Sequence, residues 1–150
     1  MTDARPTLTS DALAIVREIT RRSGHEIRNA LNGVAVNVEV VRSRVSREPR
    51  DTALESFAER ASSEVAAASA LTSGTLSLIG AILGALEAGT LTATTAGGIP
   101  ALKLTVSGDR ALALVSEITP LTERIGVRVE RSRKTVILSV PPEGTSHSKD

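Results

Sequence analysis

Apolar residues recur with a helical period in two long stretches of the chain. In residues 11–47 they step by four and three, at Ile27, Leu31, Val34, Val38, Val41 and Val45. In residues 51–88 the same steps give Leu54, Ala58, Ala61, Val65, Ala68, Thr72, Thr75, Ile79, Ile82 and Leu86. A sustained period of 3.5 residues is typical of left-handed supercoiled helices. The pattern predicts two long helices, each with one apolar seam.

The two stretches are separated by the short segment 46–50, which contains Pro49. Proline is costly inside a helix but fits the first turn of a new one. Nearly equal lengths and a tight connection predict an antiparallel helical hairpin. Leu71, Leu78 and Leu83 lie beside the second seam and widen it. Since one hairpin gives each seam a single partner, we expect two copies to form a homodimeric four-helix bundle.

A second, smaller unit follows the hairpin. Residues 89–98 are small and are expected to form a linker. Alternating residues predict strands near 102–106, 127–131 and 135–140, with a helix from Asp109 to about Ile118 and a further turn between Pro120 and Gly126. This predicts a β-α-β-β unit over 99–140 that is too small to be stable alone, so we expect it to pack on the bundle or on another copy of the chain. We expect residues 1–10 to be flexible and the tail 141–150 to be disordered. The predicted fold class is mainly α with a small α+β appendage.

The amino-acid composition excludes or disfavours several classes of catalytic and binding site. The chain has no cysteine and two histidines, and Phe57 is its single aromatic residue. Thiol catalysis, disulfides and thiolate metal sites are therefore excluded, and a histidine-based zinc site is disfavoured. With a single aromatic side chain for base stacking, the chain does not fit a single-strand nucleic-acid reader. Its net charge of +1 does not suggest a general polyanion binder.

One segment has the length of a membrane span. The 22 residues from Val65 to Leu86 carry no charge. Glycine and hydroxyl side chains interrupt the segment, and its most apolar part, Leu76–Leu86, has 11 residues. We expect a buried helix rather than a membrane span, with membrane association as an alternative. The N-terminus lacks the pattern of a signal peptide, so we expect a cytoplasmic protein.

Reactive side chains gather in residues 21–33. Extrapolating the first repeat places Gly24 on the seam and His25 about 100° away from it, facing outward. Arg22, Asn29 and Asn32 follow helical spacing from His25 and are expected on the same face. Glu26 is adjacent and can orient the imidazole. An ordinary solvated helix face is the alternative interpretation.

The string Gly24-His25-Glu26-Ile27-Arg28-Asn29-Ala30-Leu31-Asn32 resembles the H-box of two-component sensor histidine kinases. The usual form of that motif is His-Glu-(Leu/Ile)-Arg-(Asn/Thr)-Pro-Leu, and Ala30 stands here in place of the proline. A helical hairpin followed by a small α/β unit also resembles the order of the family's dimerisation and phosphotransfer region and ATPase domain. The resemblance implies that His25 is the phosphoacceptor, that Glu26 raises the basicity of its attacking nitrogen, and that Asn29 orients a water in members with phosphatase activity.

The ATPase half of the resemblance is incomplete. No asparagine follows Asn37, and the chain has neither an Asp-x-Gly-x-Gly loop nor a P-loop. Residues 106–112 resemble the start of the kinase ATPase domain, so we interpret 99–140 as a vestigial form that does not bind ATP. The alternative interpretation is an unrelated β-α-β-β unit, which would lack ATP binding as well. No cofactor is expected in this chain, and Mg²⁺ would be supplied by the partner.

These features lead to two functional hypotheses. In the first, the chain is a phosphorelay histidine phosphotransferase that moves a phosphoryl group between receiver-domain aspartates through His25, without acting as an autonomous ATP-dependent kinase. Arg21, Arg22, Arg28 and Asn32 are expected to contact the acidic receiver, with Arg17 adding positive charge. Solubility and ion pairs on the helix surface are the alternative roles of these arginines. In the second, the chain is a non-catalytic regulator: an inhibitor that docks on a sensor kinase, or a response-regulator phosphatase acting through Asn29.

Overall fold

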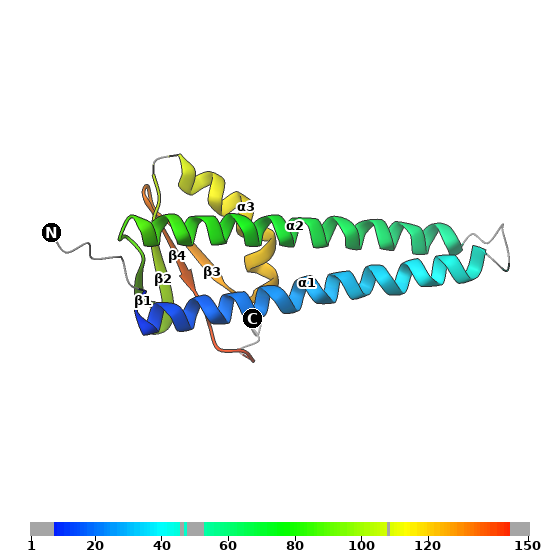
Figure 1. Ribbon diagram of the computed structural model, residues 1–150, viewed down its shortest axis with the longest axis horizontal. Coiled ribbons are helices and arrows are strands. Elements are labelled where there is room, and N and C mark those ends of the chain that lie inside the picture. The colour runs from blue at the N-terminus through cyan, green and yellow to red at the C-terminus, as the bar shows by residue number, and fades with distance from the viewer. Residues whose placement is uncertain (1–7, 46, 48–52, 108, 145–150) are drawn as a thin grey trace, which may run out of the picture.

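A computed structural model describes residues 8–45, 47, 53–107 and 109–144, and within them the chain is mainly helical. Two long helices, α1 (Ser10–Val45) and α2 (Ala53–Glu87), precede a unit made of two strands, one helix and two strands (Figure 1). That unit comprises β1 (Thr92–Ala96), β2 (Ile99–Thr105), α3 (Arg110–Ile125), β3 (Arg128–Arg131) and β4 (Thr135–Ser139), and we call it the α/β unit.

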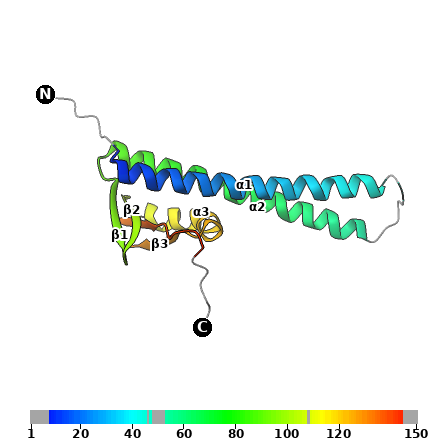
Figure 2. The ribbon, with the colours of Figure 1, turned by 90° about the horizontal axis from the view of Figure 1, so that it is seen from below.

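The long helices lie side by side and antiparallel in both ribbon views (Figures 1 and 2). Their bounds agree with the predicted stretches to within two residues at each end. At the start of α1, the side chain of Thr9 accepts a hydrogen bond from the backbone N–H of Ala12 and so caps the helix (3.2 Å). Most of the predicted connection, Ser46 and residues 48–50, lies outside the described residues.

The four strands form one antiparallel sheet in the order β1-β2-β4-β3. The prediction that residues 89–98 form a linker is wrong, because β1 lies there and pairs with β2 from Thr92↔Lys103 to Ala96↔Ile99. Gly97 and Gly98 make the turn with positive φ angles of 59° and 78°, which glycine adopts without steric cost. The appendage is therefore β-β-α-β-β rather than β-α-β-β.

Helix α3 is continuous to Ile125, where we predicted a break before Pro120. Proline supplies no N–H to the carbonyl of Ser116, but this turn is exposed, so water can take the place of that donor. The helix ends at Gly126, whose φ of 70° is left-handed and whose N–H donates to the carbonyl of Thr122.

The core lies where the α/β unit packs against one end of the hairpin. Its largest fully buried side chains come from α2, the sheet and α3: Leu71, Leu102, Leu104, Ile118, Leu121, Val136 and Leu138. Gly74 permits the close approach of α2 to α3, since a Cβ at this position would lie 3.1 Å from the carbonyl oxygen of Glu117. The other end of the hairpin extends beyond the α/β unit (Figure 2).

The sequence pattern identified the buried residues of the two long helices only in part. Leu71 and Leu78, expected beside the second seam, are buried, because α3 packs on that side of α2. Several seam residues and their neighbours are instead largely exposed, and we call them the apolar stripe: Leu31, Val38 and Val45 on α1, and Val65, Leu76, Ile79 and Leu83 on α2.

The segment after β4 departs from the predicted disordered tail. Pro141 is buried and its carbonyl accepts a hydrogen bond from α1, and Glu143 forms an ion pair with Arg21 on the same helix. The remainder of the predicted tail, 145–150, lies outside the described residues, as do residues 1–7 of the predicted flexible N-terminus. The part of that N-terminus that is described includes Ser10, the first residue of α1.

Candidate functional site

His25 lies near the middle of α1 and is exposed. Asn29, Asn32 and Val36 follow it at steps of four, three and four residues, so the four side chains line up along one side of the helix. All four are exposed, and Val36 retains 63% of its accessible surface. We call this row the His25 stripe.

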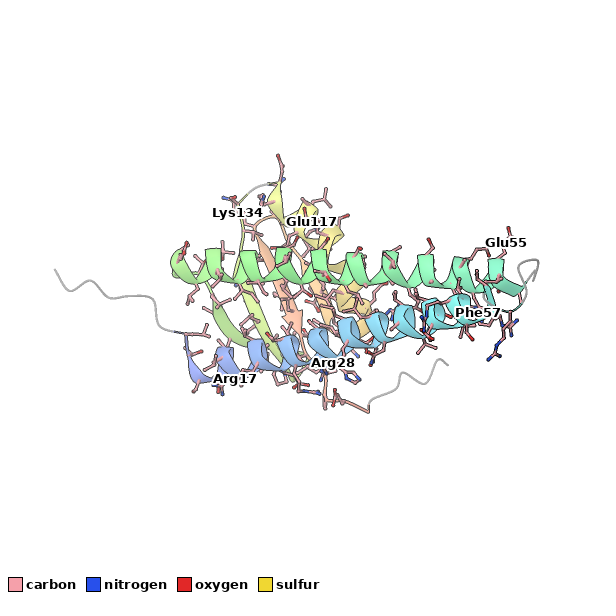
Figure 3. All side chains as sticks on the ribbon, turned by 45° about the vertical axis from the view of Figure 1, so that its right-hand side comes forward. Arg17, Arg28, Glu55, Phe57, Glu117 and Lys134 are labelled. Carbon is pink, nitrogen blue, oxygen red and sulfur yellow. The ribbon has the colours of Figure 1, made fainter. Side chains whose placement is uncertain are left out.

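The polar members of the His25 stripe have no partner within the part of the chain that the structure describes. Neither His25, Asn29 nor Asn32 makes a hydrogen bond or ion pair with another described residue. Arg28 also lacks such a contact there and lies, like Arg17, on the side of α1 away from α2 (Figure 3). These side chains are free to contact another molecule.

Glu26 is partly buried and faces α3. Its Oε2 lies 3.7 Å from Nη1 of Arg124, and the two side chains are 23% and 48% exposed. The carboxylate next to the candidate acceptor is thus paired with the last turn of α3.

Arg22 is the one site prediction that the structure overturns, since we expected it on the exposed face with His25. It is 8% exposed. Its Nε donates to Oε1 of Glu18 (2.7 Å), its Nη1 to the carbonyl of Ile125 (3.1 Å) and its Nη2 to the carbonyl of Pro141 (2.7 Å). The α/β unit packs on this side of α1 and covers Arg22, which therefore joins the two parts of the fold.

Arg21 is exposed and, with Arg22, Glu18 and Glu143, forms a cluster of ion pairs. It donates from Nε and Nη2 to the two carboxylate oxygens of Glu18 (3.1 and 2.9 Å) and also binds Glu143. Hydrogen bonds from Arg21 and then Arg22 lower the pKa of Glu18 from 4.5 to about 2. Glu18 in turn raises the pKa of Arg21 above its ordinary value.

An open cleft of about 500 Å³ adjoins this cluster. Its walls are the end of α3, the start of β3 and residues 141–144, and Arg22, Arg124 and Arg128 all line it. Since Arg22 precedes His25 by one helical turn, the cleft and the His25 stripe are neighbours on one side of α1.

Sequence reasoning missed Glu18, Arg124 and Glu143. A signal existed for Glu18, which precedes Arg21 and Arg22 by three and four residues, the spacing of helical ion pairs. Arg124 and Glu143 carry no comparable signal, because each meets α1 only through the tertiary fold.

Two further properties bear on function. Among the described residues, no group of three or more His, Cys, Asp or Glu side chains is placed to hold a metal ion. Helix α2 is long and apolar enough to cross a membrane, and 28% of its most apolar window is buried in the fold. By itself that second finding is weak, because core helices of soluble proteins pass the same test.

Comparison with known proteins adds no assignment. No family model, curated protein or solved structure matches this chain.

Proposed function

We propose that this protein is a phosphorelay histidine phosphotransferase that carries a phosphoryl group between receiver-domain aspartates on His25. The observation that supports this most directly is the His25 stripe: an exposed imidazole next to Glu26 in sequence, followed on one side of the helix by two asparagines that have no partner among the described residues. A structural role would not require these side chains to be exposed together.

The chemistry requires one nucleophile. The lone pair on Nε2 of His25 attacks the phosphorus of an aspartyl phosphate, a P–N bond forms, and the P–O bond to the aspartate breaks and releases its carboxylate. Glu26 would accept a hydrogen bond from Nδ1–H and so favour the tautomer with its lone pair on Nε2. Attack by a second receiver's aspartate on the phosphohistidine reverses the step. Mg²⁺ bound by the receiver would offset charge on the transferred group.

The surroundings of His25 suit an acidic partner. Arg21 and Arg28 are exposed near the acceptor, and Arg17 lies further along the same helix. Cations at the rim of an interface speed the encounter with an acidic surface more than they add affinity. Val36 extends the His25 stripe with an exposed apolar side chain that a docked receiver would cover.

We further propose that the apolar stripe is the contact between two copies of the chain. Leu31, Val38 and Val45 recur every seven residues on α1, and Leu76, Ile79 and Leu83 follow with steps of three and four on α2. This spacing suits the left-handed packing of a four-helix bundle.

Dimer formation also accounts for the apolar character of α2 without a membrane. The large apolar side chains of α2 that remain exposed follow one stripe, whereas a membrane-spanning helix outside a bundle is apolar on every side. The proposed localisation is therefore cytoplasmic. Sedimentation of the protein with membranes after washing at high salt would contradict this.

Transfer to His25 is tested with a panel of receivers loaded with acetyl phosphate. We expect at least one receiver to lose its label to this protein as phosphate that is labile in acid and stable in base. The matched variants are His25→Gln, which should take up no phosphate, and the same substitution at the second histidine of the chain, His147→Gln, which should take it up as the wild type does. If no receiver labels the wild-type protein, and nucleotide does not label it either, the phosphotransfer function is wrong.

The same panel separates the alternative functions. Faster loss of receiver phosphate that persists in His25→Gln and disappears in Asn29→Ala would indicate a response-regulator phosphatase. Inhibition of a sensor kinase that is unchanged in His25→Gln would indicate a blocking regulator.

The dimer is tested by sedimentation velocity. Ile79→Glu combined with Leu83→Glu should convert the protein to a monomer. Leu112→Glu is the matched control, because Leu112 is an exposed leucine on α3, outside the apolar stripe. A wild-type protein that sediments as a monomer at micromolar concentration would contradict the proposed assembly.

A further inference from the structure

Glu26 is held by the α/β unit. Its carboxylate lies 3.7 Å from the guanidinium of Arg124 on α3. Within the described chain no hydrogen bond joins Glu26 to His25, although the two are neighbours in sequence. The carboxylate expected to orient the imidazole is therefore engaged elsewhere.

The backbone next to Arg124 is fixed to α1. Arg22 donates to the carbonyl of Ile125, the residue after Arg124, and to the carbonyl of Pro141. This buried contact ties the end of α3 to the helical turn that precedes His25. Arg124 is thus brought to Glu26 by the docking of the whole α/β unit, and its pairing does not depend on its own side-chain conformation alone.

We propose that Arg124 is a positioning residue for the His25 site: its guanidinium holds the Glu26 carboxylate on the α3 side, and breaking this ion pair frees the carboxylate to accept a hydrogen bond from Nδ1–H of His25. The inference deepens the proposed phosphotransfer function and rests on it. Freeing Glu26 would increase the share of imidazole whose lone pair is on Nε2, the nitrogen that attacks phosphorus.

Other charges on the surrounding elements do not take the place of Arg124. Arg21 and Arg22 are paired with Glu18, and Arg21 also binds Glu143. Helix α2 carries no charge between Val65 and Leu86. Arg28 on α1, Glu123 on α3 and Arg128 on β3 are also charged. Within the described residues, the ion pair of Glu26 is made with Arg124.

The contacts of Arg22 and Arg124 connect the cleft with the His25 site. Arg22 and Arg124 both line the 500 Å³ cleft beside the His25 stripe. A receiver that displaced the end of α3 on docking would release Glu26 at the same time. The acceptor would then become more reactive only when a partner is bound.

The test uses the full chain labelled with ¹⁵N-histidine and measures the tautomer of His25 by long-range ¹H–¹⁵N spectra at a pH where the imidazole is neutral. Arg124→Gln should raise the fraction of the Nδ1–H tautomer. In a Glu26→Gln background the same substitution should have no effect, because no carboxylate remains to be released. Arg110→Gln is the matched control, since it changes the same residue type at the opposite end of α3.

A second readout is the rate at which a phosphorylated receiver labels His25. For an ion pair this exposed, Arg124→Gln should accelerate labelling by roughly two- to five-fold. An unchanged tautomer fraction in Arg124→Gln would overturn the inference and leave the phosphotransfer function standing. A tautomer shift without labelling by any receiver would support the role of Arg124 at Glu26 and contradict phosphotransfer.

Discussion

The buried polar contact between α1 and the α/β unit can be removed with one substitution, Arg22→Met. Methionine keeps an unbranched apolar stem in the buried position and removes the guanidinium. Its loss leaves the carbonyls of Ile125 and Pro141 without the donors that now lie 3.1 and 2.7 Å away. Glu18 stays paired, because Arg21 still donates to both of its oxygens.

The expected cost follows from these two hydrogen bonds. A buried hydrogen bond from a charged donor contributes about 1.5–3 kcal/mol. The variant no longer has to bury a guanidinium, which offsets part of the loss. We therefore expect Arg22→Met to lower the free energy of unfolding by about 3 kcal/mol. For a chain of this size that corresponds to a decrease in Tm of about 6–12 °C.

Thermal unfolding followed by circular dichroism measures this effect, at one protein concentration because any dimer makes the midpoint depend on concentration. Arg21→Met is the matched control: the same substitution one residue earlier removes exposed ion pairs to Glu18 and Glu143, and should leave Tm close to that of the wild type. Equal Tm values for the two variants would refute the assignment of Arg22 as the joint between hairpin and α/β unit.

Two further predictions concern the same elements. Because the pKa of Glu18 is lowered from 4.5 to about 2 in the fold, its stabilising contribution should be complete above about pH 4.5 and be lost as the pH falls toward 2. In urea titrations at several pH values, Glu18→Gln should therefore differ from the wild type most above that window, and a constant difference down to pH 2 would contradict the ion pairs. Gly74→Ala should destabilise the protein, since the new Cβ meets the carbonyl oxygen of Glu117 at 3.1 Å, whereas Gly84→Ala, with no atom within 4 Å, should stabilise it by up to about 1 kcal/mol. Equal stability changes for these two alanine variants would show that α2 and α3 are not closely packed at Gly74.

Local periodicity was sufficient for the parts of the fold that depend on local structure. The two long helices and the exposure of His25 follow from spacing along one helix. Strand β1 was missed because its residues, Thr92–Ala96, are small and lack the apolar alternation used to recognise the other strands. Its position depends on pairing with β2 across a tight turn of two glycines.

The site was predicted less completely for a related reason. Helical spacing from His25 placed Arg22 on the exposed side, but the partners that bury Arg22 lie 103 and 119 residues away in the chain. Tertiary packing also decides which residues of α2 are buried. Leu71 and Leu78 are buried because α3 packs closely against α2 at Gly74. A periodic pattern identifies an apolar side of a helix, but it does not indicate which edge of that side the next element covers.

The two proposed surfaces lie on different sides of α1. His25 and Leu31 are six residues apart, so their side chains are separated by about 120° around the helix. Arg22 and Glu26, which contact the α/β unit, lie on the side of His25. A dimer that covers Leu31, Val38 and Val45 would therefore leave His25, the His25 stripe and the adjoining cleft accessible to a receiver. This separation explains how the hairpin could use an apolar stripe for the proposed self-association and still present a polar row of side chains around the proposed phosphoacceptor. It also means that a monomeric variant should still accept phosphate on His25, so that the tests of assembly and of phosphoryl transfer can be interpreted independently.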